Sequence, residues 1–90
     1  MITVQTINNT TFKVTVQEST TTTHTVTVSP SYYEKLTDKS VKPEELVKRS
    51  FEFLLKRESN TSILRSFDLP VIGSYFPEYE RTIRDMLKSN

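Results

Sequence analysis

The first thirty residues alternate between apolar and polar positions with a period of two. Apolar residues stand at positions 2 and 4, at 12, 14 and 16, and at 26 and 28, separated by threonine or lysine. Such alternation, rich in β-branched residues, is typical of strands that bury one face. The pattern therefore predicts three strands, near residues 2–7, 11–17 and 22–28, each with an apolar face and a threonine-rich face.

The expected register follows from the rule that opposed residues of an antiparallel pair share a face of the sheet. A connection over residues 7–9 pairs Val4 with Phe12 and keeps apolar side chains together. The same reasoning places His24 on the apolar face of the third strand, opposite Val16. We therefore expect a three-stranded antiparallel β-meander.

The period of the apolar positions changes to that of a helix after the third strand. Ser29 can cap a short helix that starts at Pro30 and ends near residue 37. The strongest helical pattern covers residues 43–58, where apolar residues recur at spacings of three and four. Short turns follow, and Pro77 starts a last helix.

Together these elements predict the fold class α+β, a β-meander followed by helices packed on one face. One domain is expected over residues 1–90, with the meander in 1–29 and the helical part in 30–88. The buried face of the sheet is expected to consist of its inward-pointing apolar residues, Phe12, Val14, Val16, Val26 and Val28.

Composition narrows the chemistry that the chain can perform. There are 12 Lys and Arg against 11 Asp and Glu, one His, one Gly and no Cys. The lack of Cys excludes disulfides and thiolate metal sites, and one Gly excludes glycine-rich phosphate loops. His24 has no nucleophile or orienting carboxylate marked by a motif beside it. We expect no enzyme activity, and no catalytic, cofactor-binding or metal-ligating residues.

Targeting signals are also not evident in the chain. The N-terminal residues show no basic region followed by an apolar run, and no stretch of 18 apolar residues occurs. A cytoplasmic protein with no membrane contact is therefore expected.

Residues 23–57 contain a strand, then two helices joined by a polar linker. In this order and spacing the stretch resembles ribbon-helix-helix proteins. The resemblance implies two chains that pair their strands into a ribbon in the DNA major groove, with alternate polar side chains reading bases. Carried over by position, Thr23, Thr25 and Thr27 would face bases, and Lys42 would lie near a phosphate at the start of the second helix.

A second resemblance covers residues 25–80. The stretches 50–58, 62–72 and 75–79 look like a family of small bacterial proteins of unknown function. That similarity implies a shared fold and gives no activity.

The long helix predicts a surface that a single sheet cannot cover. Helical geometry separates Phe51 and Phe53 by about 200° around the axis, so both cannot face the sheet. Phe53 must therefore lie under the C-terminal helix or at an interface with a partner chain.

Two functional hypotheses follow from these observations. The leading one is a non-enzymatic interaction module, without cofactors, that forms homodimers or binds a protein partner. It rests on a thin core, a nearly uncharged sheet with exposed edges and the lack of catalytic motifs. The alternative is a ribbon-helix-helix-like DNA-binding regulator or antitoxin.

Overall fold

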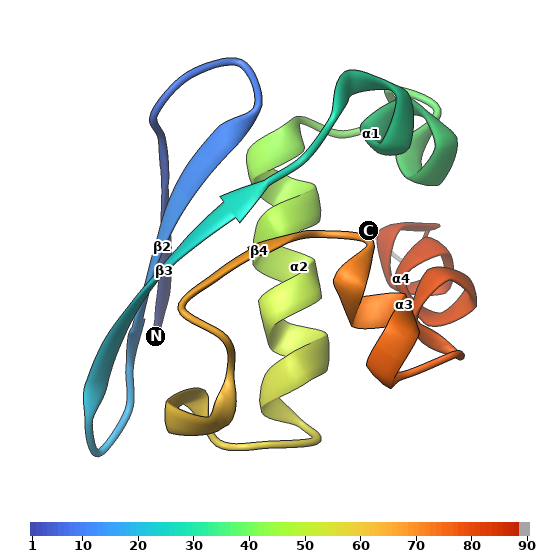
Figure 1. Cartoon of the computed structure of the whole chain (residues 1–90). Helices are drawn as coiled ribbons and strands as arrows, with labels where there is room; N and C mark the ends of the chain where they lie inside the picture. The colour runs from blue at the N-terminus through green and yellow to red at the C-terminus, as the bar shows by residue number, and fades with distance from the viewer. Residues whose placement is uncertain (89–90) are drawn as a thin grey trace.

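The computed structural model describes residues 1–88 and has the α+β fold that the sequence predicts. A sheet with strand order β1-β2-β3-β4 carries its helices on one face (Figure 1). The strands are β1 (Ile2–Thr6), β2 (Thr11–Gln17), β3 (Thr21–Thr27) and β4 (Ser66–Asp68). The helices are α1 (Pro30–Thr37), α2 (Pro43–Leu55), the 3-10 turn η1 (Asn60–Ser62), α3 (Val71–Tyr75) and α4 (Tyr79–Lys88).

The sheet has four strands and not the three that we expected. β1, β2 and β3 form the predicted antiparallel meander, and β4 joins the free side of β3 in parallel orientation. The N–H of Thr25 donates to the carbonyl of Arg65 (2.7 Å), and the N–H of Leu69 donates to that of Thr27 (2.9 Å). Three residues are too few to show a period of two, so the sequence predicts only a short turn here.

The expected register of the hairpin is wrong by two residues. Val4 lies opposite Val14 and not Phe12, because the connection between β1 and β2 covers residues 7–10. The register between β2 and β3 is also shifted by two residues, so His24 lies opposite Val14 and not Val16. A shift of two residues leaves every side chain on its expected face, since strand side chains alternate. The predicted inner and outer faces are therefore correct.

α1 and α2 begin at the residues that the sequence predicts, whereas the end of α2 and the start of α4 differ from the prediction. The Ser29 hydroxyl accepts a hydrogen bond from the N–H of Tyr32 and caps α1 at 3.2 Å. The long helix α2 ends at Leu55 and not at residue 58, and α4 begins at Tyr79 and not at Pro77.

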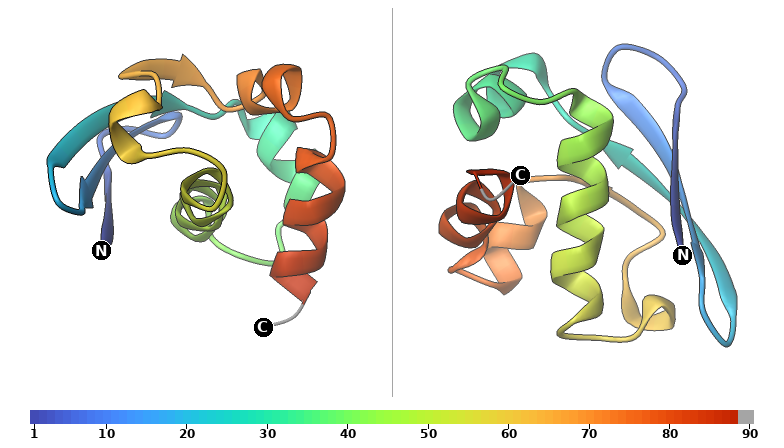
Figure 2. Two further views of the ribbon diagram at one scale, coloured as in Figure 1. Left: turned by 90° about the horizontal axis from the view of Figure 1, so that it is seen from below. Right: turned by 180° about the vertical axis from the view of Figure 1, so that it is seen from behind.

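The long helix α2 lies in the middle of three layers, with the sheet on one side and α1 and α4 on the other (Figure 2). Phe51 faces the sheet, where its ring centroid is 5.3 Å from that of His24. Phe53 faces the C-terminal helix, where its ring is 5.2 Å from that of Tyr79. The Tyr79 hydroxyl is bonded to Ser50 at 2.6 Å, and its burial raises the pKa of Tyr79 well above the usual range. Within residues 1–88 no helix covers the opposite face of the sheet (Figure 2).

Candidate functional site

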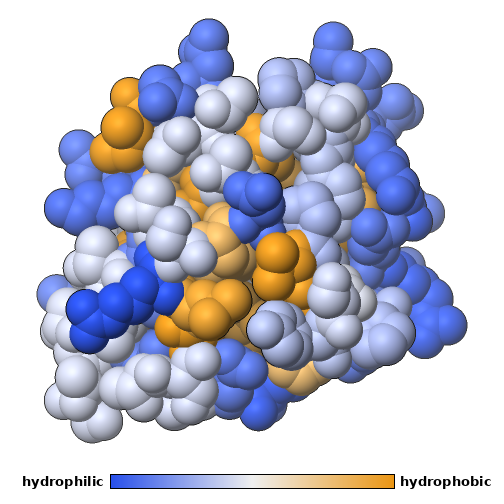
Figure 3. Space-filling view, viewed as in Figure 1, coloured by the Kyte–Doolittle hydropathy of each residue, from blue (hydrophilic) through white to orange (hydrophobic). Residues whose placement is uncertain are grey.

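An apolar hollow opens on the surface between the end of α2, the segment that precedes β4, and α3. Its volume is about 180 Å³. Figure 3 shows apolar surface gathered over the part of the molecule where η1, β4 and α3 lie in Figure 1. The side chains that line the hollow include Leu54, Glu58, Ile63, Leu64, Phe67 and Tyr75. We refer to this feature as the apolar hollow.

Two side chains of the apolar hollow are more exposed than large apolar residues usually are. Leu64 is 47% exposed and Tyr75 is 66% exposed. Within residues 1–88 only two other large apolar residues, Met1 and Ile7, are classed as exposed, and both flank β1. Apolar surface that is concentrated in one place is typical of binding sites, whereas scattered exposed residues are not.

The segment that forms one wall of the apolar hollow is held in place by buried polar contacts. The side-chain amide of Asn60 donates to the carbonyl of Thr20 at 2.7 Å and to the hydroxyl of Thr22 at 3.0 Å. These bonds attach η1 to the turn between β2 and β3. Ile63 is buried as a result, and the next side chain, Leu64, points to the surface.

His24 holds the segment between η1 and β4 at a second point, Leu64. Its Nδ1 lies 2.8 Å from the carbonyl of Leu64, and its Nε2 lies 2.9 Å from the hydroxyl of Thr22. A carbonyl can only accept a hydrogen bond, so Nδ1 carries the proton. In the neutral ring Nε2 then accepts from Thr22, whose oxygen in turn accepts from Asn60. His24 is 1% exposed, and both of its nitrogens are engaged, so it serves as a structural link between β3 and the segment before β4.

A second, polar hollow lies at the other side of this segment, beside the turn between β2 and β3. It measures about 300 Å³ and is lined by residues 20–23, His24, Asn60, Thr61, Ile63 and Arg65. We refer to it as the polar hollow. Every buried side-chain nitrogen or oxygen in the described part of the chain has a hydrogen-bond partner. The polar groups below this hollow therefore satisfy one another.

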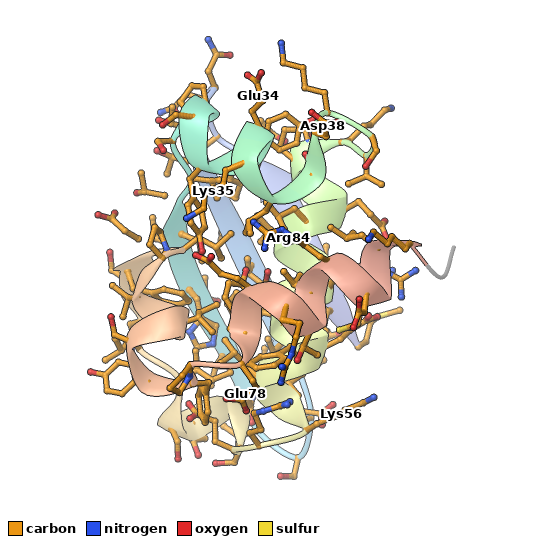
Figure 4. The ribbon with its side chains drawn as sticks, turned by 90° about the vertical axis from the view of Figure 1, so that its right-hand side faces the viewer. Glu34, Lys35, Asp38, Lys56, Glu78 and Arg84 are labelled. Atoms are coloured by element: carbon orange, nitrogen blue, oxygen red, sulfur yellow. The ribbon has the colours of Figure 1, made fainter. Side chains whose placement is uncertain are left out.

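The charges of the molecule lie largely away from the apolar hollow. Glu58 is the one charged side chain among the residues that line it, as far as the described chain shows. On the helical side, oppositely charged groups pair with one another: Lys35 with Glu80 at 3.5 Å and Arg57 with Glu78 at 3.2 Å. Figure 4 shows charged side chains of both signs on this side, on α1, on α4 and just outside the ends of α2 and α4. The two signs are therefore mixed among the described residues of this side.

The residues that the ribbon-helix-helix resemblance singles out are not gathered in one place. Thr23, Thr25 and Thr27 project from the outer face of β3. Lys42 is exposed at the start of α2, which packs on the inner face of the sheet. β3 is hydrogen-bonded on both sides, to β2 and to β4.

Phe53 lies under the C-terminal helix, which is one of the two positions expected from the sequence. It is 1% exposed and lies inside the chain, with its ring 5.9 Å from that of Phe76 and edge-on to that of Tyr79. The Arg57 guanidinium covers the ring at 3.6 Å from its centroid. The C-terminal helices therefore cover this side of α2.

Sequence reasoning did not identify the side chains of the apolar hollow as a site. The sequence predicts only short turns after the long helix, and Ile63, Leu64 and Phe67 lie in this stretch. One signal was present in the sequence. In an extended segment, adjacent apolar residues such as 63 and 64 point to opposite sides, so one of them faces outward where only one side is covered.

Within residues 1–88 no group of His, Cys, Asp or Glu side chains is placed to hold a metal ion. None of the described helices is long and apolar enough to cross a membrane. No family model, curated protein or solved structure matches this chain.

Proposed function

We propose that this protein is a non-enzymatic interaction module that binds a protein partner by taking one of its apolar side chains into the apolar hollow. The single observation that carries the proposal is the exposure of Leu64 and Tyr75 around a hollow whose floor is apolar. Interfaces gain most of their affinity from a few large side chains that are buried in such pockets. Covering these residues with a partner removes apolar surface from water, which is favourable.

The size of the apolar hollow limits the side chain that it can hold. An apolar cavity of about 150 Å³ in another protein accommodates benzene. A hollow of about 180 Å³ therefore suits the ring of a phenylalanine or the branched end of a leucine. A larger indole would project from it.

The charge at the wall of the hollow indicates what should stand beside that side chain. The Glu58 carboxylate can accept hydrogen bonds from a lysine, an arginine or a backbone N–H of the partner. An acidic residue next to the apolar anchor would meet like charge. The preferred partner is therefore a segment with a Phe or Leu and a basic neighbour.

The ribbon-helix-helix alternative has less support than this proposal. In that arrangement the strand has to pair with its mate in a second chain, whereas β3 has β2 on one side and β4 on the other. The outer face of β3, which includes Thr23, also has no Lys or Arg side chain. Contacts of such side chains with phosphates provide affinity for DNA.

A selection from a random peptide library tests the proposal without knowledge of the natural partner. Peptides selected on the unmodified protein should share an aromatic or leucine residue, with a basic residue close to it. Leu64→Asp should weaken the binding of these peptides by about tenfold or more, because it places a charge on the rim of the hollow. Ile7→Asp is the matched control, since Ile7 is similarly exposed (53%) outside the hollow, and it should leave binding unchanged.

Two results would contradict the proposal. One is a set of selected peptides without a common apolar residue, or with affinities that Leu64→Asp does not alter. The other is retention of the protein on non-specific DNA at low salt, with release as the salt concentration rises. That second result would favour the DNA-binding alternative.

A further inference from the structure

The two edges of the sheet are protected from pairing to very different degrees. Edge strands expose unpaired backbone groups, and proteins usually protect them by shortness, charge or proline. β4 is three residues long, contains Asp68, and is flanked by Arg65 and Pro70. β1 has five residues, pairs with β2 without interruption, and contains no charge, proline or glycine. β1 therefore presents an unprotected edge.

The backbone groups of β1 that point outward can be identified from the ladder. The N–H of Ile7 donates to the carbonyl of Thr11 at 2.9 Å, and the N–H of Gln17 donates to that of Met1 at 2.8 Å. Hydrogen-bonded and non-hydrogen-bonded pairs alternate in an antiparallel ladder, so the odd-numbered residues of β1 bond to β2. The N–H and C=O groups of Ile2, Val4 and Thr6 point away from β2. Within residues 1–88 no strand pairs with them (Figure 2).

We propose that β1 is a dimerisation edge, at which a second copy of this chain pairs its own β1 in antiparallel orientation. Centred on Val4, this pairing sets Val4 against Val4 of the second copy and Ile2 against Thr6. All three outward-pointing residues then form hydrogen-bonded pairs, and each such pair exchanges two bonds. The same surface is used by both copies, as a two-fold axis requires.

A second, independent observation supports the same register. Met1 and Ile7, the remaining two exposed large apolar residues of the described chain, stand at the two ends of β1. In the pairing centred on Val4, Met1 lies directly opposite Ile7 of the second copy, at both ends of the ribbon. Apolar pairs opposed across strands stabilise a sheet. The dimer thus covers apolar side chains that the single chain leaves in water.

Ile2 and Val4 supply a third reason for a second copy in particular. Both are partly buried members of the core, on the side of the sheet covered by α2. Their remaining exposure is at the edge, where the equivalent residues of the second copy would lie. The side chains of β1 itself are uncharged, so no like-charged side chains of the two strands face each other. The charged groups beside the edge are held within the chain: Glu44 accepts from Thr6, and the Met1 amino group pairs with Glu18.

The expected dimer is weak. Pairing of one five-residue strand buries less than the roughly 1,600 Å² of a typical stable interface. Dissociation constants on the order of micromolar to hundreds of micromolar are therefore expected. The mass of the full chain should rise from one copy to two over this concentration range in sedimentation equilibrium.

Lysines on the outer face of β1 test the edge without changing the core. Thr3 and Gln5 are exposed and lie opposite each other across the proposed two-fold axis. Thr3→Lys with Gln5→Lys should raise the dissociation constant about tenfold or more, through like charges on facing positions. Within the chain Gln5 lies opposite Lys13, so the control has to carry the same clash. The matched control is Thr23→Lys with Thr25→Lys, which adds the same charge to exposed outer-face positions of β3, with position 25 also opposite Lys13, and should leave association unchanged.

Amide hydrogen exchange separates this dimer from any other. The N–H groups of Val4 and Thr6 should become protected as concentration rises, whereas those of Thr3 and Gln5 should be protected throughout. A chain that stays monomeric up to millimolar concentration would overturn the proposal. So would a dimer in which Val4 and Thr6 exchange freely, or which the double lysine variant leaves intact. Leu64→Asp should not affect association, so failure of the peptide-binding proposal is recognised separately.

Discussion

The two hollows that flank residues 60–65 are built from the same short segment and share Ile63, yet their side chains are satisfied in different ways. In the polar hollow, Asn60, Thr22 and His24 bond to one another and to backbone carbonyls. In the apolar hollow, Leu64 and Tyr75 remain in contact with water. Exposed apolar side chains, and not volume, therefore distinguish the proposed binding surface, since the polar hollow is the larger one.

The difference also indicates how the proposed binding surface is positioned. The polar side chains below the polar hollow already bond within the chain, where they hold η1 and the segment before β4 against β3. These groups are therefore not free to bind a ligand. This fixed segment keeps Leu64 in its outward position. The hydrogen bonds below the polar hollow thus hold the wall of the apolar hollow in place. Substitutions at the polar hollow should change stability, and substitutions at the apolar hollow should change binding.

The largest effect is expected at Phe51, which lies under both hollows. Its ring is 5.3 Å from that of His24 and 6.1 Å from that of Phe67. Phe51→Ala should lower the free energy of unfolding by about 3–5 kcal/mol, since it leaves a cavity in the core. That loss is a large part of the stability of a small domain. Urea unfolding measures it, and Phe51→Leu, which keeps most of the apolar volume, should cost clearly less. Equal stability of Phe51→Ala and the unmodified chain would contradict the assignment.

Phe53 should affect the two hollows unequally. It packs on Phe76, which lines the apolar hollow, and on Tyr79, and it contacts no residue of the polar hollow among its ring partners in the described chain. Phe53→Ala should cost about 3 kcal/mol or more and lower the melting temperature to the same extent at every protein concentration. It should also weaken peptide binding in the fraction that stays folded. A variant that loses only a concentration dependence of melting would instead place Phe53 at an interface.

Asn60 and Leu64 should show opposite responses. Asn60→Ala leaves the carbonyl of Thr20 and the hydroxyl of Thr22 without their donor, which should cost about 1–3 kcal/mol of stability. Leu64→Asp changes a side chain that is already half exposed and should cost less than about 0.5 kcal/mol, although it should weaken peptide binding by about tenfold or more. Thermal unfolding and peptide titration of both variants test this pair. If Leu64→Asp is the more destabilising one, the apolar hollow is part of the core and not a site.

The smallest effect is a pH dependence that arises far from both hollows. The Thr6 hydroxyl donates to the Glu44 carboxylate, and this bond, with the N–H of Glu44 itself, holds the pKa of Glu44 below its usual range. A carboxylate with a lowered folded-state pKa contributes stability above its unfolded pKa of about 4.3, and this contribution disappears as the pH falls through the folded-state pKa.

Thr6→Val should therefore reduce the loss of stability on acidification between about pH 5 and pH 3. Urea unfolding at a series of pH values measures this change. The variant should not alter peptide binding at pH 7. An unchanged pH dependence would show that the bond does not contribute in solution.

The sequence predicted those features that depend on local periodicity. The faces of β1, β2 and β3 follow from alternation, and even an error of two residues in register left Val4 and His24 on their correct faces. The ends of α2 and the presence of β4 were harder to predict. β4 has only three residues, and the segment that leads to it is held near β3 by Asn60 of η1. Asn60 bonds to Thr20, which is forty residues away in the chain, and no local pattern records such a contact.

The apolar hollow was not predictable for a related reason. In the sequence, Leu64 and Tyr75 have the same character as the buried Leu69 and Tyr79. Which of them remains exposed is decided by the packing of α3 and the segment before β4, and no local pattern records that outcome. The interaction-module hypothesis could be drawn from composition, but its location on the surface could not.

A titration with N-acetyl-phenylalaninamide, followed by NMR on the full chain, tests most directly whether the apolar hollow binds and the polar hollow does not. This small ligand carries the proposed anchor with two peptide-like groups, and its size limits it to millimolar affinity. We expect saturable shifts of Leu64, Phe67 and Tyr75 and no shifts of Thr22, His24 and Asn60. The effect should be lost in Leu64→Asp but not in Ile7→Asp. Shifts centred on the polar hollow, or none that saturate at any site, would contradict it.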